Sequence, residues 1–146
     1  MSRYSFLLLI IVSGAGLAVQ SAINGRLREG VGSPVVAAAI SFGVGLALLM
    51  GAALLGILSG ESSTKAAPWW AYLGGALGAV YVLTAVIGVS RVGVATLTMT
   101  AIAGQLVASL AIDHFGWLGV ARQPLSPVRI FGALLLFIGV LLVQRR

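Results

Sequence analysis

Polar side chains recur at one-face spacing on two otherwise apolar segments of this 146-residue chain. One set has spacings of 3, 4 and 4 residues and consists of Ser13, Gly16, Gln20 and Asn24. The other has spacings of 7, 4 and 4 residues and consists of Thr98, Gln105, Ser109 and Asp113. Residues at such separations share one face of an α-helix. Hydroxyl and carboxamide groups on these faces can hydrogen-bond a polar solute, so the pattern predicts a shared polar interior.

These polar side chains also have structural explanations, which reduce the set of solute contacts. Ser and Thr in membrane helices bond back to a carbonyl one turn earlier, which favours a structural role for Ser13, Thr84 and Thr98. Carboxamides can also tie two helices together. The predicted solute contacts are Gln20, Tyr81 and Gln105 first, then Asn24 and Ser109. Their uncharged polar character favours a neutral or polar solute held by hydrogen bonds.

Asp113 is the one carboxylate within a predicted helix. An aspartate at membrane depth can take up and release a proton, which makes Asp113 a candidate for proton coupling. In the alternative, Asp113 lies at the membrane surface, in water or paired with Arg122 or Arg91. Asp113 and His114 are consecutive and point about 100° apart on a helix, so they form no ready acid–base pair. No carboxylate lies in the middle of a helix, so a strong coupling site of the usual design is not predicted.

The composition places the chain in the membrane class. Its hydrophobic fraction is 60% and its charged fraction 8%, whereas soluble proteins have about a quarter of their residues charged. The net charge of +6 comes from arginines beside the membrane, which face lipid headgroups, and so predicts no binding of nucleic acid. With no cysteine and one histidine, no metal or other cofactor is expected. No catalytic constellation appears, so the chain is not predicted to be an enzyme.

Five apolar stretches predict an all-α integral membrane protein with one five-helix domain. Each is near the roughly 20 residues needed to span a bilayer, and the expected ranges are 4–24, 34–58, 69–90, 94–113 and 127–143. Ser33-Pro34 and Ser126-Pro127 are typical of helix starts, and Gly25 is expected to end the first helix. A polar turn is expected over 60–65, and Trp69, Trp70 and Trp117 are expected as interface anchors. A cleaved secretory signal is the alternative for the N-terminal segment.

Positive charges divide almost evenly between the two sides of a membrane that five helices cross. The side of the N-terminus carries Arg3, Lys65, Arg122 and Arg129. The other side carries Arg26, Arg28, Arg91, Arg145 and Arg146. Four against five is too small a bias to set one orientation. Two opposed copies could then pair as the halves of an inverted-repeat (5+5) transporter.

Several stretches resemble the YdcZ-like family (domain of unknown function 606) of the drug/metabolite transporter superfamily. They are residues 20–27 (QSAINGRL), 32–34 (GSP), 41–45 (SFGVG), 68–70 (PWW), 74–82 (GGALGAVYV), 104–116 (GQLVASLAIDHFG) and 122–127 (RQPLSP). The resemblance covers nearly the whole chain. It implies a multi-pass protein of the bacterial inner membrane that works as an antiparallel pair. The first helix lacks the glutamate of the related four-helix multidrug exporters, so proton-driven export of cations is not implied.

The expected function is therefore small-solute transport by alternating access in an antiparallel, dual-topology homodimer, with membrane lipids as its surroundings. A closely related paralogue of opposite topology could replace the second copy. The alternatives are a non-transporting membrane subunit that packs with a partner, and a pore-forming protein.

Overall fold

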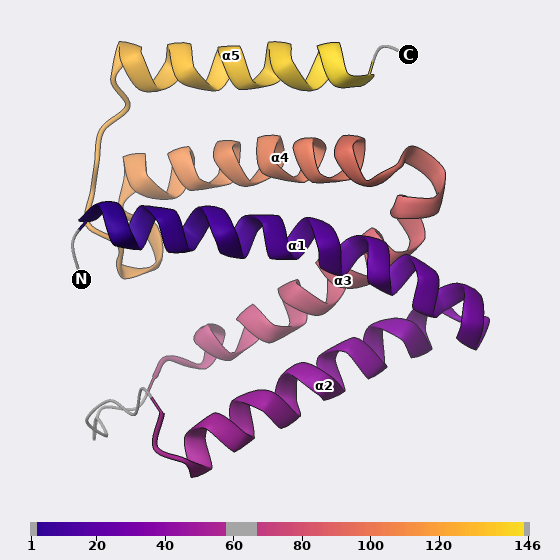
Figure 1. Cartoon of the computed structure of the whole chain (residues 1–146). Coiled ribbons are helices and arrows are strands. Elements are labelled where there is room, and N and C mark those ends of the chain that lie inside the picture. Colours follow the sequence, from indigo (N-terminus) through magenta and orange to yellow (C-terminus); the bar gives the residue numbers. More distant parts are fainter. Residues whose placement is uncertain (1–2, 58–66, 145–146) are drawn as a thin grey trace. The chain divides into compact units, whose positions relative to one another are not determined.

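The computed structural model describes residues 3–57 and 67–144, and the regular elements within these ranges are all helical. The five long helices (Figure 1) are α1 (Arg3–Val31), α2 (Pro34–Leu54), α3 (Leu73–Val92), α4 (Val94–Phe115) and α5 (Pro127–Gln144). Short 3-10 turns η1 (Trp69–Tyr72) and η2 (Trp117–Gly119) precede α3 and follow α4. All five helices are long and apolar enough to cross a membrane. The predicted all-α five-span architecture is thus confirmed. Helices suit a membrane because each one pairs its own backbone N–H and C=O groups where no water is present.

The helices form two compact units, and each is described by itself. The first, Met1–Arg91, contains α1, α2 and nearly all of α3, and the second, Val92–Arg146, contains α4 and α5. The polar turn expected over 60–65 lies outside the described residues, as do Arg145 and Arg146.

Helix α1 continues past its expected stop at Gly25. This glycine instead permits contact with α3, because an ideal Cβ on Gly25 would lie 2.6 Å from the Cγ1 atom of Val89. Carbon atoms in contact lie about 3.5–4.0 Å apart, so a side chain here would force the two helices to shift. The helix ends at Val31, before Gly32, whose φ of 74° is a left-handed conformation that glycine adopts without strain. Arg28 is therefore a helical residue and not part of a turn.

Both predicted Ser-Pro helix starts are confirmed. The backbone N–H of Val36 donates to the Oγ atom of Ser33 at 3.4 Å, and Pro34 opens α2. The backbone N–H of Arg129 donates likewise to the Oγ atom of Ser126 at 3.3 Å, at the start of α5. Each serine satisfies one of the backbone donors that a helix leaves free at its N-terminus.

The core of the first unit is small and built from short side chains. Its buried members are Ala37, Ala38, Val82 and Val86, with Leu27, Tyr81 and Leu83 packed against them. Small residues allow close approach of helix backbones, which stabilises helix association where lipid removes the hydrophobic driving force.

In the second unit α4 and α5 lie side by side and antiparallel (Figure 1). At one end the Nε2 amide of Gln144 donates to the hydroxyl of Thr100 at 3.2 Å, and Ala103 and Val140 are buried between the helices. A second polar contact at the opposite end of the pair involves the ion pair of Arg129 with Asp113. Polar ties at both ends hold the register of the two helices.

Candidate functional site

The polar stripe of α1 becomes more buried along the helix. Ser13 and Gly16 are exposed, Gln20 is half-buried, and Asn24 is only 4% exposed. The expected one-face spacing thus brings two carboxamides, from Gln20 and Asn24, to the part of α1 that packs within the first unit.

The carboxamide of Asn24 makes no hydrogen bond with any described residue. Burying an unbonded amide costs about 1–3 kcal/mol, so such groups are normally paired. Among the described residues, no side-chain nitrogen or oxygen is both fully enclosed and unpaired. The amide of Asn24 therefore keeps a small accessible surface, and its two N–H donors and its carbonyl oxygen make no hydrogen bond with a described residue.

Gln20 lies one turn before Asn24 and lines a groove between α1 and α2. The groove has a volume of about 330 Å³, and its lining residues are Gln20, Ser41, Phe42, Gly45, Leu46 and Leu49. The groove is mostly apolar, and Gln20 and Ser41 bring polar groups to it. Such a surface suits a small solute with a polar group and an apolar body.

The two polar residues expected on α3 have different surroundings. Tyr81 is half-buried and packs against the core of the first unit, and no described residue hydrogen-bonds its hydroxyl. The hydroxyl of Thr84 donates to the carbonyl oxygen of Val80 at 2.8 Å. The predicted structural back-bond is thus confirmed for Thr84, whereas the role of Tyr81 in solute contact stays a prediction.

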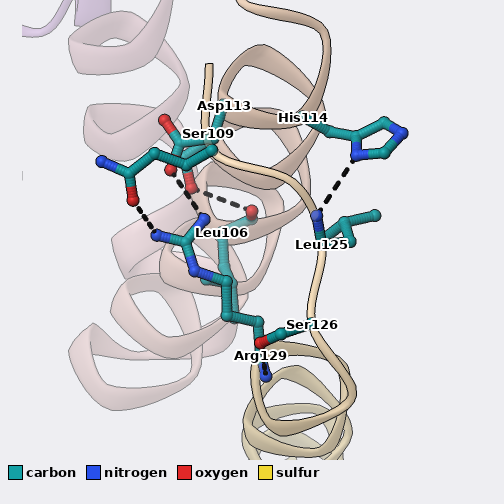
Figure 2. Close-up of polar contacts among 8 residues, drawn as sticks. Leu106, Ser109, Asp113, His114, Leu125, Ser126 and Arg129 are labelled. Carbon is teal, nitrogen blue, oxygen red and sulfur yellow. Dashed lines mark hydrogen bonds and ion pairs between the residues drawn. The ribbon is translucent and has the colours of Figure 1, made fainter. Parts of the chain in front are cut away.

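On α4, the polar stripe is exposed within its own unit. Gln105 is exposed, makes no hydrogen bond with a described residue, and lies at the midpoint of the Val94–Phe115 helix. Ser109 is also exposed, and its hydroxyl donates to the carbonyl oxygen of Leu106 at 2.9 Å (Figure 2). The hydroxyl proton of Ser109 is therefore used within α4, and only its oxygen remains free as an acceptor. A shared interior for the stripes of α1 and α4 stays a prediction.

Asp113 forms an ion pair, but with neither of the arginines expected from the sequence. The Nη1 atom of Arg129 lies 3.2 Å from the Oδ2 atom of Asp113 (Figure 2), and the two side chains are 34% and 30% exposed. Arg122 instead donates from Nε to the backbone carbonyl of His114 at 3.0 Å. The reason is local: the connection between α4 and α5 folds back, so the first turn of α5 and the last turn of α4 lie together.

The connection after α4 is held by further hydrogen bonds to the same helix end. The backbone N–H of Gln123 donates to the carbonyl of Asp113 at 2.7 Å, and its side-chain oxygen accepts from Arg129 at 2.6 Å. The backbone N–H of Leu125 donates to the Nδ1 atom of His114 at 3.2 Å (Figure 2), which requires Nδ1 to be unprotonated. Arg129 thus bridges a carboxylate and a carboxamide at the junction of α4 and α5.

A cavity of about 500 Å³ adjoins this junction. Its polar lining comes from Ser109, Asp113 and Arg129, and the rest is apolar, including Leu106 and Leu136. Asp113 and Arg129 thus bring a negative and a positive charge to a cavity whose remaining lining is apolar. No group of three His, Cys, Asp or Glu residues able to hold a metal ion occurs within 3–57 and 67–144.

One polar contact of the first unit was not predicted from the sequence. The Nη1 atom of Arg28 donates to the hydroxyl oxygen of Ser90 at 3.0 Å, which joins α1 to α3. The spacing could have indicated it, because Arg28 follows Asn24 by four residues and so continues the same helix face. Because Gly25 was expected to end the first helix, Arg28 fell outside the predicted helix and so outside the stripe.

Comparisons with known proteins identify the family of the chain. The family model described as "Putative inner membrane exporter, YdcZ" matches residues 5–142. The inner membrane protein YdcZ of Escherichia coli (strain K12) is 30% identical over 151 residues, which cover 100% of this chain and 99% of that protein. No solved structure matches the chain. With five membrane-spanning helices and a family match over nearly its whole length, the chain is an inner-membrane protein that belongs to the YdcZ family.

Proposed function

We propose that this protein moves a small polar solute across the inner membrane as an antiparallel, dual-topology homodimer. The description of the family, "Putative inner membrane exporter, YdcZ", supports a transporter-like role rather than an enzymatic one. The proposal adds the assembly, the alternating-access mechanism and the residues that contact the solute.

The observation that carries the proposal is the unused hydrogen-bonding capacity of three carboxamides, those of Gln20, Asn24 and Gln105. None of them bonds a described residue, although polar groups in a membrane are costly unless they face protein or a polar cavity. Tyr81 and Ser109 would complete the contacts with a free hydroxyl and a free acceptor oxygen. A solute that donates hydrogen bonds to these groups and accepts hydrogen bonds from them would offset the free-energy cost of placing unpaired polar groups in a membrane.

Two features support the proposed antiparallel arrangement. The Lys and Arg residues divide four against five between the two sides, so neither orientation is favoured. Gln105 lies at the middle of α4, and a residue at mid-membrane keeps its depth when the chain is inverted. Two opposed copies would then present equivalent groups to one central site that opens alternately to each side.

Asp113 is the proposed coupling residue. Protonation of its carboxylate would break the ion pair with Arg129 and free the first turn of α5 from the end of α4. The contact has two states, with the ion pair formed or broken. It can couple proton uptake to movement of α5, because a proton on Asp113 favours the broken state.

Two experiments test the proposal. The first compares reporters that are active only in the cytoplasm or only outside it, each fused after Arg146. Comparable activity of both supports dual topology, whereas activity of one alone contradicts the homodimer model. A partner of opposite orientation would then be required.

The second experiment measures export by mass spectrometry of the medium from cells that express the wild type or the Gln20→Ala, Gln105→Ala double variant. A solute exported by the wild type should be retained by the variant, which is checked for equal membrane abundance. Equal export would refute the role of these amides. Ion leakage from liposomes containing the protein would instead indicate a pore, and no solute flux at all would indicate a non-transporting subunit.

A further inference from the structure

Arg28 is held at a defined place between α1 and α3. Its side chain is half-buried, and its Nη1 atom donates to the hydroxyl of Ser90 at 3.0 Å. Gly25 lies about one turn before Arg28 on α1, and Val89 directly precedes Ser90 on α3. The close approach of Gly25 and Val89 therefore brings Arg28 and Ser90 within reach of each other. A guanidinium has five N–H donors, and this contact uses one of them.

The charge of Arg28 is not neutralised by a carboxylate in the described part of the chain. The neighbouring Glu29 pairs with Arg26, and Asp113 pairs with Arg129. The remaining acidic residue of the sequence, Glu61, lies outside the described residues. Arg28 is therefore a half-buried cation whose hydrogen-bond partner among the described residues is a neutral hydroxyl.

Arg28 also continues the polar face of α1. Gln20, Asn24 and Arg28 follow one another at intervals of four residues, which place each about 6 Å further along one helix face. The guanidinium is thus one turn from the buried, unbonded amide of Asn24 and two turns from Gln20 in its groove. The guanidinium of Arg28, the unbonded amide of Asn24 and the amide of Gln20 thus follow one another along one face of α1.

We propose that Arg28 binds an anionic oxygen group, a carboxylate or a phosphate, of the transported solute, and that Asn24 donates a second hydrogen bond to it. This inference rests on the proposed function and names the class of its substrate: a small organic anion whose polar remainder meets Gln20. The planar guanidinium can offer two parallel N–H donors to a carboxylate or phosphate, and such charged hydrogen bonds are about twice as strong as neutral ones. Ser90 accepts from one nitrogen and so orients the group.

The test uses the full chain in nanodiscs of phosphatidylcholine, with acetate, benzoate and inorganic phosphate as probes. Benzamide and benzylammonium are the neutral and cationic counterparts of benzoate. Dissociation constants are measured for the wild type and for Arg28→Gln, Arg28→Lys and Arg26→Gln. Arg26 is the matched control, because it lies two residues away, has a side chain that is 85% exposed, and pairs with Glu29. Size-exclusion chromatography and circular dichroism confirm that each variant is folded.

We expect at least one anionic probe to bind the wild type. Its affinity should fall about tenfold or more in Arg28→Gln, less in Arg28→Lys, and less than twofold in Arg26→Gln. Benzamide and benzylammonium should bind more weakly than benzoate. Equal anion affinity in wild type and Arg28→Gln overturns the proposal, and so does binding of benzamide as tight as that of benzoate, or no binding of any of the three anions.

Two further measurements separate the possible sources and functions. If native mass spectrometry shows Arg28-dependent retention of phosphatidylglycerol while no free anion binds, the site holds a lipid headgroup and the solute proposal is wrong. Uptake of the bound anion is measured in proteoliposomes. Arg28-dependent binding without uptake supports the anion site and refutes transport of that anion. Solute transport that is unaffected by Arg28→Gln supports the proposed function and overturns the anion site.

Discussion

Replacing Gly25 with alanine should weaken the packing of α1 against α3. The added Cβ would lie 2.6 Å from the Cγ1 atom of Val89, which is about 1 Å closer than carbon atoms in contact. Valine in a helix has one strongly preferred rotamer, so the methyl group cannot turn away without strain. The helices must separate, and the hydrogen bond of Arg28 with Ser90 lengthens with them.

The magnitude follows from two opposing terms. Overpacking of a close contact costs about 1–3 kcal/mol, whereas alanine in place of glycine stabilises a helix by about 1 kcal/mol. Gly16→Ala is the matched control, because Gly16 lies on the same helix and an added Cβ there would meet nothing within 4 Å. Gly25→Ala should therefore be less stable than Gly16→Ala by about 1–3 kcal/mol.

The assay is equilibrium unfolding of the purified chain from mild detergent into sodium dodecyl sulfate, followed by tryptophan fluorescence. Val89→Ala removes the methyl group that the new Cβ would meet, so the Gly25→Ala, Val89→Ala double variant should recover part of the loss, with a coupling energy of at least about 1 kcal/mol. Equal stability of Gly25→Ala and Gly16→Ala, or strict additivity in the double variant, would refute the close contact as the reason for this glycine.

Asp113→Asn should lower unfolding free energy by no more than about 1 kcal/mol, because the ion pair with Arg129 is about one-third exposed at both partners and an amide oxygen can still accept. Arg129→Met should cost more, since it also removes the donor to Gln123; the same unfolding assay compares them, and an equal loss contradicts the bridging role. Ser33→Ala should cost about 1 kcal/mol through loss of the cap to Val36, and Ser33→Asp should retain most of the stability. If Ser33→Ala and Ser33→Asp unfold alike, the cap contributes little.

Some parts of the site were predictable because they depend on helix periodicity alone. Residues four apart share a face whatever surrounds them, so Gln20 and Asn24 could be placed together before any packing was known. The two Ser-Pro helix starts were predictable for a similar reason, since a cap depends on the next three residues of the same segment.

Other parts were not predictable because they depend on which faces meet. For an Asp113 at the membrane surface, the sequence predicted either water or a pair with Arg122 or Arg91, but the connection after α4 folds back and brings Arg129 to it. Gly25 was expected to stop a helix, which is the common reason for glycine at such a place. In the structure it permits close approach of α3, and no property of the α1 sequence distinguishes the two roles.

The sequence by itself determined the number of membrane spans and the all-helical class, and it predicts a near balance of positive charge between the two sides. These properties follow from hydropathy and from the need of a backbone in lipid to bond itself, and both act segment by segment. Only the tertiary structure decided that Asn24 is buried without a partner, that Arg28 reaches Ser90, and that Arg129 bridges Asp113 and Gln123. Burial and pairing depend on contacts between segments far apart in the chain, and such contacts exist only once the helices have packed.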